Sequence, residues 1–209
     1  DNVYSFNGNT TAFVEMEDGI NEWGLAIGIT FVYPTIIKPG FNAGLLVRYL
    51  LEKCKTTNEA IESIKILPIA SQQTLTIADS TGDIVVIECN AENIEVIKPN
   101  IDENFVVATN EFNSENMKKY NNYNIDDWKA KERYEVAYNT LKNNKDKFSF
   151  ELAKNILSGK YGFMCQYDRN TNADTVWSVI CDIKNKQIYR VEGNPSRKQF
   201  KEDKRIEFK

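Results

Sequence analysis

Apolar and polar residues form distinct blocks along this chain, and each block predicts one kind of element. The run GLAIGITFVY at residues 24–33 is continuously apolar and rich in β-branched and aromatic residues, which is typical of a strand covered on both faces. Residues 41–54 place leucine and tyrosine side chains at helical spacing, which predicts an amphipathic helix. Thr56 and Glu59 have the spacing of a capping box, so we expect a second helix to begin there and to stop before Pro68.

The middle of the chain has the pattern of an antiparallel sheet. Residues 73–89 contain two β-type runs separated by Ser80-Thr81-Gly82, and the turn chemistry of these three residues predicts a hairpin. Further strands are expected at residues 10–15 and 93–98 and in the opening stretch. An apolar run at residues 105–108 predicts one more buried strand.

The pattern changes after residue 112. Helical spacing appears at residues 126–144 and again at 149–159, where a serine is placed to cap the start and a glycine to stop the end. Strand-like runs follow at residues 174–183 and 187–193, and the charged tail from Arg197 is expected to be solvated. Helices and antiparallel strands in alternating blocks predict an α+β layered domain and not parallel βαβ units.

Length, composition and charge narrow the function classes. A chain of 209 residues with 42% hydrophobic residues fits one domain with a real core. A net charge of -4 argues against a nucleic-acid partner, which would need a basic face. No apolar run is long enough to span a membrane and no export signal opens the chain, so we expect a soluble, cytoplasmic protein.

Cysteine and histidine usage restricts the chemistry. The four cysteines are irregularly spaced in mostly apolar surroundings, which favours reduced, structural thiols over a disulfide framework. The chain contains no histidine, and this excludes Ser-His-Asp and Cys-His mechanisms and His-ligated metal sites within it.

Five segments occur here in an order that resembles a known group. They are EDGINEWGLAIGITFV, KPGFNAGLLVRYLLEKCKTTNEAI, VVATNEF, DDWKAKERYE and DTVWSVICDIKNKQIYRVEGNP. In this order the chain resembles the linear amide C–N hydrolases, which include penicillin acyltransferases and choloylglycine (bile salt) hydrolases. The resemblance implies an N-terminal-nucleophile (Ntn) hydrolase with a four-layer αββα sandwich.

The same resemblance implies a mechanism that needs no histidine. The nucleophile of the group is a cysteine at the mature amino terminus, and its own α-amine, which titrates near ~7.7 to 8, serves as the base. That cysteine, and an arginine/aspartate pair soon after it, precede the region seen here, whereas this chain begins at Asp1. We therefore expect residues 1–209 to be one N-terminally incomplete domain, inactive alone, with no nucleophile in this chain. A truncated gene sequence is the simplest explanation; a separately processed subunit is the alternative.

The predicted strand at residues 105–108 ends on three polar residues, Thr109, Asn110 and Glu111, without an ordinary turn signal. By the resemblance, Asn110 matches an asparagine whose side-chain amide donates to the tetrahedral oxyanion, and one such donor is worth roughly 10² to 10³ in rate. The alternative is that Asn110 only caps a turn. Glu111 stands where the group often has histidine, which predicts a more acidic pocket. Thr109 and Glu111 are counted with the oxyanion and substrate-binding candidates.

Three further residues have a functional and a structural interpretation. Arg133 matches an arginine that would orient the surroundings of the nucleophile, although a helix-surface arginine paired with a neighbouring glutamate would look the same. Thr30 aligns with a position that helps to form the oxyanion hole, but threonine is also a common strand former. Cys165 lies beside polar residues, yet without a base in view it is better explained as a structural thiol.

Three aromatic residues are candidates for an acyl pocket. They are Trp23, Tyr33 and Trp128, and the alternative is that all three belong to the core.

The resemblance predicts a cysteine amidase or acyltransferase that acts on the non-peptide C–N bond of a small acyl amide through an acyl-enzyme. No metal or organic cofactor is expected, and a homo-oligomer is compatible with the group. Penicillins, bile salts, N-acyl homoserine lactones and N-acyl amino acids are all substrates of this kind. The alternative is a catalytically inactive relative that binds acyl or amide ligands, or an inactive fragment.

Overall fold

The structure is a computed structural model that describes residues 3–125, 128–165, 167–168, 172–205 and 208. The helices are α1 (Ala43–Lys53), α2 (Thr57–Ile66), the short 3-10 helix η1 (Lys118–Tyr120), α3 (Ala130–Asn143) and α4 (Phe150–Leu157). The strands are β1 (Phe6–Asn9), β2 (Asp18–Asn21), β3 (Ala26–Phe31), β4 (Gln73–Ala78), β5 (Ile84–Cys89), β6 (Ile94–Ile97), β7 (Tyr167–Asp168), β8 (Ala173–Asp174), β9 (Trp177–Asp182), β10 (Gln187–Glu192) and β11 (Lys201–Glu202).

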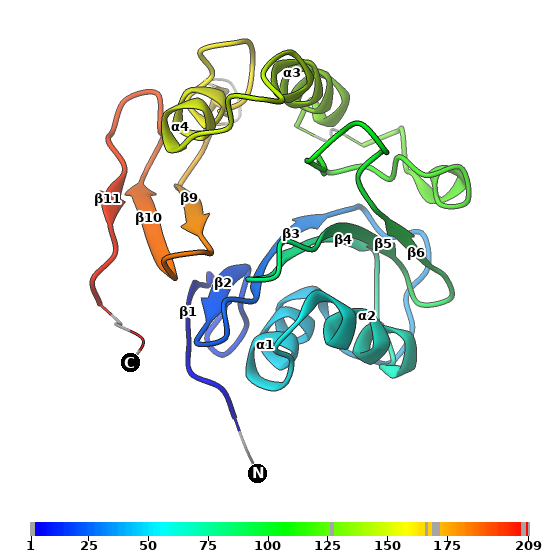
Figure 1. Cartoon of the computed structure of the whole chain (residues 1–209). Coiled ribbons are helices and arrows are strands. Elements are labelled where there is room, and N and C mark those ends of the chain that lie inside the picture. Colours follow the sequence, from blue (N-terminus) through cyan, green and yellow to red (C-terminus); the bar gives the residue numbers. More distant parts are fainter. Residues whose placement is uncertain (1–2, 126–127, 166, 169–171, 206–207, 209) are drawn as a thin grey trace.

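The larger sheet has the strand order β1-β2-β3-β4-β5-β6, and every neighbouring pair is antiparallel. The predicted strands at 24–33 and 93–98 and the predicted hairpin at 73–89 are confirmed as β3, β6 and the pair β4–β5. Helices α1 and α2 cover one face of this sheet (Figure 1). The main core lies between these two helices and the sheet, and Leu46, Leu50 and Leu75 are fully buried in it.

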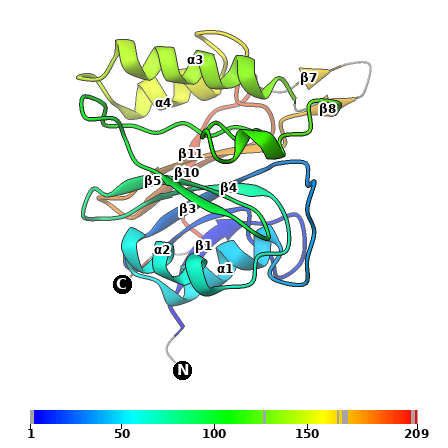
Figure 2. The same cartoon turned by 90° about the vertical axis from the view of Figure 1, so that its right-hand side faces the viewer.

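The second sheet has the order β11-β10-β9 and packs against the other face of the large sheet. Ile20 of β2 and Ala26 of β3 contact Ile188 of β10 in a core between the two sheets. Helices α3 and α4 lie on the outer side, so the order from one side to the other is helices, sheet, sheet, helices (Figure 2). This order confirms the four-layer αββα sandwich.

Side-chain caps determine where the helices begin. Asn42 accepts from the amide of Leu45 at the start of α1, and Ser149 accepts from the amide of Leu152 at the start of α4, as predicted for the serine. At α2, Thr56 Oγ1 accepts from the amide of Glu59 at 3.2 Å. The Glu59 carboxylate accepts from the amide of residue 55 at 2.7 Å, one residue further back than the capping box predicts.

Two predicted strands are wrong. Residues 10–15 form turns, in which the Thr10 hydroxyl accepts from the amide of Ala12 and Phe13 is fully exposed with a left-handed φ of 48°. Local side-chain bonding of this kind competes with a sheet ladder. Residues 105–108 are not in a strand, because no described strand pairs with them; only an isolated bridge between Thr109 and Glu111 follows. Of the helix predicted at 126–144, residues 126–127 lie outside the described residues and 128–129 precede the helix, whereas α3 confirms 130–143.

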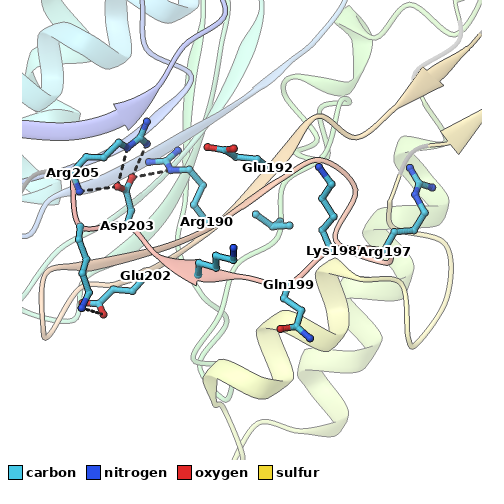
Figure 3. Close-up of a pocket in the computed structure, with 11 residues that line it drawn as sticks. Arg190, Glu192, Arg197, Lys198, Gln199, Glu202, Asp203 and Arg205 are labelled. Atoms are coloured by element: carbon cyan, nitrogen blue, oxygen red, sulfur yellow. Dashed lines mark hydrogen bonds and ion pairs between the residues drawn. The ribbon is translucent and has the colours of Figure 1, made fainter.

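The charged tail after Arg197 is mostly exposed, as expected, and Asp203 is the exception. The tail returns to the second sheet as β11, and the side chain of Asp203 is only 4% exposed. Asp203 accepts from Nη2 of Arg205 at 2.7 Å and from Nε of Arg190 at 3.0 Å (Figure 3). These hydrogen bonds, first that from Arg205, hold the pKa of Asp203 well below its usual range.

Arg190 also connects the two sheets. Arg190 of β10 is 7% exposed, and its Nη1 lies 3.8 Å from a carboxylate oxygen of Asp18 on β2. Asp18 also accepts from the indole N–H of Trp177 on β9 at 2.8 Å. Burial raises the pKa of Asp18. The closer partner of Arg190 is Asp203, at 3.0 Å against 3.8 Å for Asp18.

We predict that Asp203→Asn lowers the free energy of unfolding at pH 7 by roughly 3 kcal/mol, because it leaves a buried guanidinium without its close counterion. The pKa of Asp203 is lower in the folded state, so the carboxylate stabilises above its unfolded pKa near ~3.9 and this contribution is lost as the pH falls through the folded pKa. The difference between variant and wild type should therefore shrink on acidification below about pH 4. Urea unfolding at several pH values measures it.

The control for this prediction is Glu202→Gln on the neighbouring position of β11. Its side chain is 36% exposed, and it pairs with Lys204 at 3.6 Å, so we expect a change below about 0.5 kcal/mol. Equal effects of the two substitutions would mean that the Asp203 ion pair does not anchor the tail.

Candidate active site

The side-chain amide of Asn110 has contacts on both sides. Its Oδ1 accepts from Nη2 of Arg133 at 2.8 Å, and its Nδ2 donates to the backbone carbonyl of Phe31 at 2.8 Å. Because a guanidinium can only donate, Arg133 fixes which side of the amide carries the oxygen. The second N–H of Nδ2 has no acceptor in the described part of the chain, so one donor is left for a ligand.

The entry to α3 determines where the Arg133 guanidinium lies. Trp128 and Lys129 have left-handed φ angles of 55° and 57°, which turn the chain just before the helix. The carbonyl of Trp128 then accepts from Nε of Arg133 at 2.8 Å. Arg133 is thus held at two points, at Trp128 and at Asn110, and is not simply a surface arginine paired with a glutamate. Lysine has a single nitrogen and lacks this forked geometry.

The other candidates lie in different surroundings. The Thr30 hydroxyl is hydrogen-bonded to the hydroxyl of Thr74, its partner across the β3–β4 ladder, which is the structural interpretation of this residue. Thr109 is 4% exposed, and its hydroxyl has no hydrogen-bond partner among the residues that the structure describes. Glu111 is half-buried and bridges back to Thr109. The structure therefore brings Thr109 and Asn110 together, with Glu111 beside them.

A groove of about 420 Å³ runs from Asn110 beneath α3 and α4. Its polar end holds Asn110, Arg133 and Trp128. The remaining wall is mostly apolar, with Ala137 and Leu141 on α3 and Ile156, Leu157 and Met164 around α4. The run 106–109 also lines the groove, as do Thr175 and Ser178 near the start of β9.

Two of the segments that line this groove have no neighbouring strand among the described residues. Strand β9 pairs with β10 on one edge, and no described strand pairs with its other edge. The other segment is the run 105–108. The sequence predicts a strand there, but this run has no ladder partner in the described ranges. The buried hydroxyl of Thr109 also lacks a partner here. A buried polar group without a hydrogen bond calls for an explanation.

Buried polar residues hold the loop that carries Asn110. Glu88 of β5 is 1% exposed, and its carboxylate accepts from the amides of Asn113 and Ser114 at 2.6 and 3.1 Å and from the Ser114 hydroxyl at 2.6 Å. The amide side chain of Asn121 bonds both backbone groups of Phe112, at 2.8 and 2.9 Å. The conformation of the loop is therefore set by side chains, since regular ladders are missing.

Sequence reasoning missed these supports. The one signal for Glu88 was an acidic residue inside the apolar run IVVIEC, because a carboxylate at a buried strand position must find donors. Nothing in the sequence identified the donors, which lie 25 and 26 residues away.

Cys165 lines the apolar part of the groove. Its thiol donates to the carbonyl of Leu157 at 2.7 Å, and burial raises its pKa. Both effects favour the protonated thiol, which is a poor nucleophile.

A larger cavity of about 810 Å³ lies between the end of β10 and the C-terminal residues 197–205 (Figure 3). Its buried carboxylate, Asp203, is occupied by Arg190 and Arg205, so we assign this carboxylate a structural role. Among the described residues, no group of three His, Cys, Asp or Glu side chains could hold a metal ion. None of the described helices combines the length and the apolar character that a membrane crossing requires.

We predict that Glu88→Gln destabilises the protein by about 2 kcal/mol, because a carboxamide has only one oxygen to accept the three hydrogen bonds that Glu88 receives. Denaturant unfolding measures this change, and hydrogen exchange should show faster exchange at the amides of Asn113 and Ser114. Glu95→Gln is the matched control: Glu95 lies opposite Glu88 on β6 and has one exposed hydrogen bond to Asn116. Unchanged exchange at residues 113 and 114 would contradict the anchoring role.

Solved structures of three amide-cleaving enzymes share this fold. A variant of conjugated bile acid hydrolase from Clostridium perfringens aligns with a TM-score of 0.61 and 16% identity, over 96% of this chain and 76% of that chain. Penicillin V acylase from Agrobacterium tumefaciens aligns with a TM-score of 0.54 and 18% identity, over 86% of this chain and 63% of that chain. The N-acylethanolamine-hydrolyzing acid amidase ortholog from Caenorhabditis elegans aligns with a TM-score of 0.54 and 15% identity, over 88% of this chain and 81% of that chain. Comparison with curated protein sequences gives no match.

At these identities the likeness establishes the fold, which is that of the N-terminal-nucleophile hydrolases. The order of the layers agrees with it. A sequence model of the family described as "Acyl-coenzyme A:6-aminopenicillanic acid acyl-transferase" matches residues 2–197. The chain belongs to this family, within the linear amide C–N hydrolase group, and the resemblance inferred from its segments is confirmed.

Proposed function

We propose that the complete protein is a cysteine amidase or acyltransferase that acts on the non-peptide amide bond of a small acyl amide. The observation that carries this proposal is the hydrogen-bonded row Arg133–Asn110–Phe31. It fixes the Asn110 amide with one N–H left over at the polar end of the groove. A donor held in place before the reaction is what an oxyanion requires.

Burial raises the pKa of all four thiols of this chain and so favours their unreactive protonated form; we propose that the nucleophile lies on a segment outside residues 1–209. The thiolate attacks the amide carbon while its own α-amine accepts the thiol proton. The carbonyl oxygen becomes the oxyanion and accepts from Nδ2 of Asn110. Collapse breaks the C–N bond, the amine leaves with the proton, and a thioester remains. Water or a second amine then takes the acyl group and releases the thiol.

The groove offers a place for the segment that carries this nucleophile. Arg133, Ala137 and Leu141 are four residues apart on α3, so the groove follows that helix for about 12 Å. An extended chain covers this length with about four residues. The segment would lie between the run 105–108 and the edge of β9 that no described strand covers, with its terminal cysteine beside Asn110.

The proposal is tested on full-length protein expressed from the gene with its upstream codons. Intact mass shows whether processing exposes a cysteine, and a panel of acyl amides is then assayed for turnover. We predict that Asn110→Ala lowers kcat/KM by about 10² to 10³ through loss of the oxyanion donor. Arg133→Lys should lower it by about tenfold, because lysine can hold Asn110 or the Trp128 carbonyl but not both.

Asn58→Ala, at an exposed position on α2, is the matched control and should leave kcat/KM unchanged. A terminal cysteine without turnover on any amide would favour the alternative, a catalytically inactive relative. Turnover that survives Asn110→Ala would remove Asn110 from the mechanism.

A further inference from the structure

The cavity between the end of β10 and residues 197–205, which we call the C-terminal cavity, is lined mainly by charged side chains. It measures about 810 Å³ and shares no lining residue with the groove at Asn110. Its acidic lining residues are Glu192, Glu202 and Asp203, and its basic ones are Arg190, Arg197, Lys198, Lys201, Lys204 and Arg205. Positive charge is therefore concentrated here, in a chain whose net charge is -4.

Several of these side chains lie on the same face of the second sheet. Arg190 of β10 and Lys201 of β11 are direct partners across the ladder, and such partners share a face. Glu192, two residues after Arg190, lies on that face as well. Figure 3 shows Lys198 on the same side as Glu192, and Gln199 on the other side. The charged groups thus converge above one face.

The connection between β10 and β11 lets Lys198 lie over it. Gly193 has a φ of 105°, and a Cβ added there would come within 3.1 Å of Nζ of Lys198. The next residue, Asn194, is 3% exposed; its Nδ2 donates to Asp174 at 2.7 Å and its Oδ1 accepts from the amide of Ser196 at 2.9 Å. The connection is therefore held in a defined shape that leaves room for the lysine.

The carboxylates of the cavity do not neutralise its cations. Asp203 pairs with both Arg190 and Arg205, so two guanidinium groups share one carboxylate. Glu202 pairs with Lys204 at 3.6 Å and is thereby used.

Three cations are left with hydrogen-bond donors in excess. Lys198 and Lys201 form no ion pair with a described residue. Arg190 is 7% exposed, and its Nη1 and Nη2 have no hydrogen-bond acceptor among the described residues; Nη1 has only the longer ion pair with Asp18 at 3.8 Å. Buried donors without an acceptor are unfavourable, and an anion in the cavity would compensate their charge.

We propose that the C-terminal cavity binds the phosphate group of a small phosphorylated molecule. Arg197 is paired with Asp174 outside the cavity, so the other five basic residues and the three acidic ones leave an excess of two positive charges. A phosphate monoester carries about 1.5 to 2 negative charges near pH 7 and matches this excess better than a single carboxylate. Lysine and arginine bind phosphate oxygens through charge-assisted hydrogen bonds. The volume lies within the range of roughly 300 to 1,000 Å³ that is typical of small-molecule sites.

The shape of the cavity favours a small molecule over a nucleic acid. The cations line one concave cavity at residues 190–205, whereas a nucleic-acid backbone needs a basic face that follows many phosphates. This inference is independent of the proposed amidase, because the two sites share no residue and either can hold without the other.

The test compares ribose 5-phosphate with ribose on the full-length protein, because these two molecules differ only in the phosphate. Isothermal titration at fixed ionic strength gives the dissociation constants. We expect ribose 5-phosphate to bind with a dissociation constant below about 1 mM and to bind at least about tenfold more tightly than ribose. Equal affinity for the two overturns the proposal. So does binding of inorganic phosphate, or of a short single-stranded oligonucleotide, that is at least as tight as that of ribose 5-phosphate.

Charge variants locate the binding. Lys198→Gln and Lys201→Gln should each weaken the binding of ribose 5-phosphate by about threefold, through loss of one charged contact. Glu192→Gln should tighten it by about the same factor, because it removes a negative charge from the face that meets the phosphate, and a damaged fold does not produce such a gain.

The matched control is Lys184→Gln, which removes an exposed lysine in the turn at the other end of β10 and should leave the affinity unchanged. Affinity that stays the same in all three cavity variants, or that falls equally in the control, overturns the proposal.

Discussion

The large sheet is covered on both faces, and this double cover organises the rest of the molecule. Leu25 and Ile27 point toward α1 and α2, whereas Ala26, between them, meets the second sheet. The face of Leu25 and Ile27 is apolar, whereas the face of Ala26 also carries Thr30, Thr74 and Glu88, and both faces are covered. The two helices supply one cover and β9–β11 supply the other, and the second sheet then needs α3 and α4 on its outer side.

The candidate site lies where these layers part. It involves the end of β3, through the backbone carbonyl of Phe31, and the start of α3, through the guanidinium of Arg133. The Asn110 amide bridges them with one hydrogen bond to each. A shift of one layer against the other would break this bridge, so the orientation of the donor depends on sandwich packing far from the site.

Buried polar side chains hold the backbone near this bridge in place through hydrogen bonds. Glu88, Gln72 and Asn121 each satisfy two or more groups of irregular backbone. Buried polar networks are costly when incomplete and confer a unique geometry when complete. The irregular loop after Asn110 can thus keep a defined shape without belonging to a sheet.

The sequence by itself determined the helices α1, α2 and α4, the hairpin β4–β5, and the family, because periodicity, capping residues and turn residues act over a few neighbouring positions. It also identified Asn110 and Arg133 as candidates through their segments. It misjudged residues 10–15 and 105–108 as strands, and it did not reveal that the exposed tail returns to the second sheet as β11. Only the tertiary structure decided that Arg133 orients Asn110, that Asp203 is buried against Arg190, and that Tyr33 meets Trp128. These contacts join residues 13 to 95 positions apart, and their geometry follows from how the layers pack and not from any local pattern.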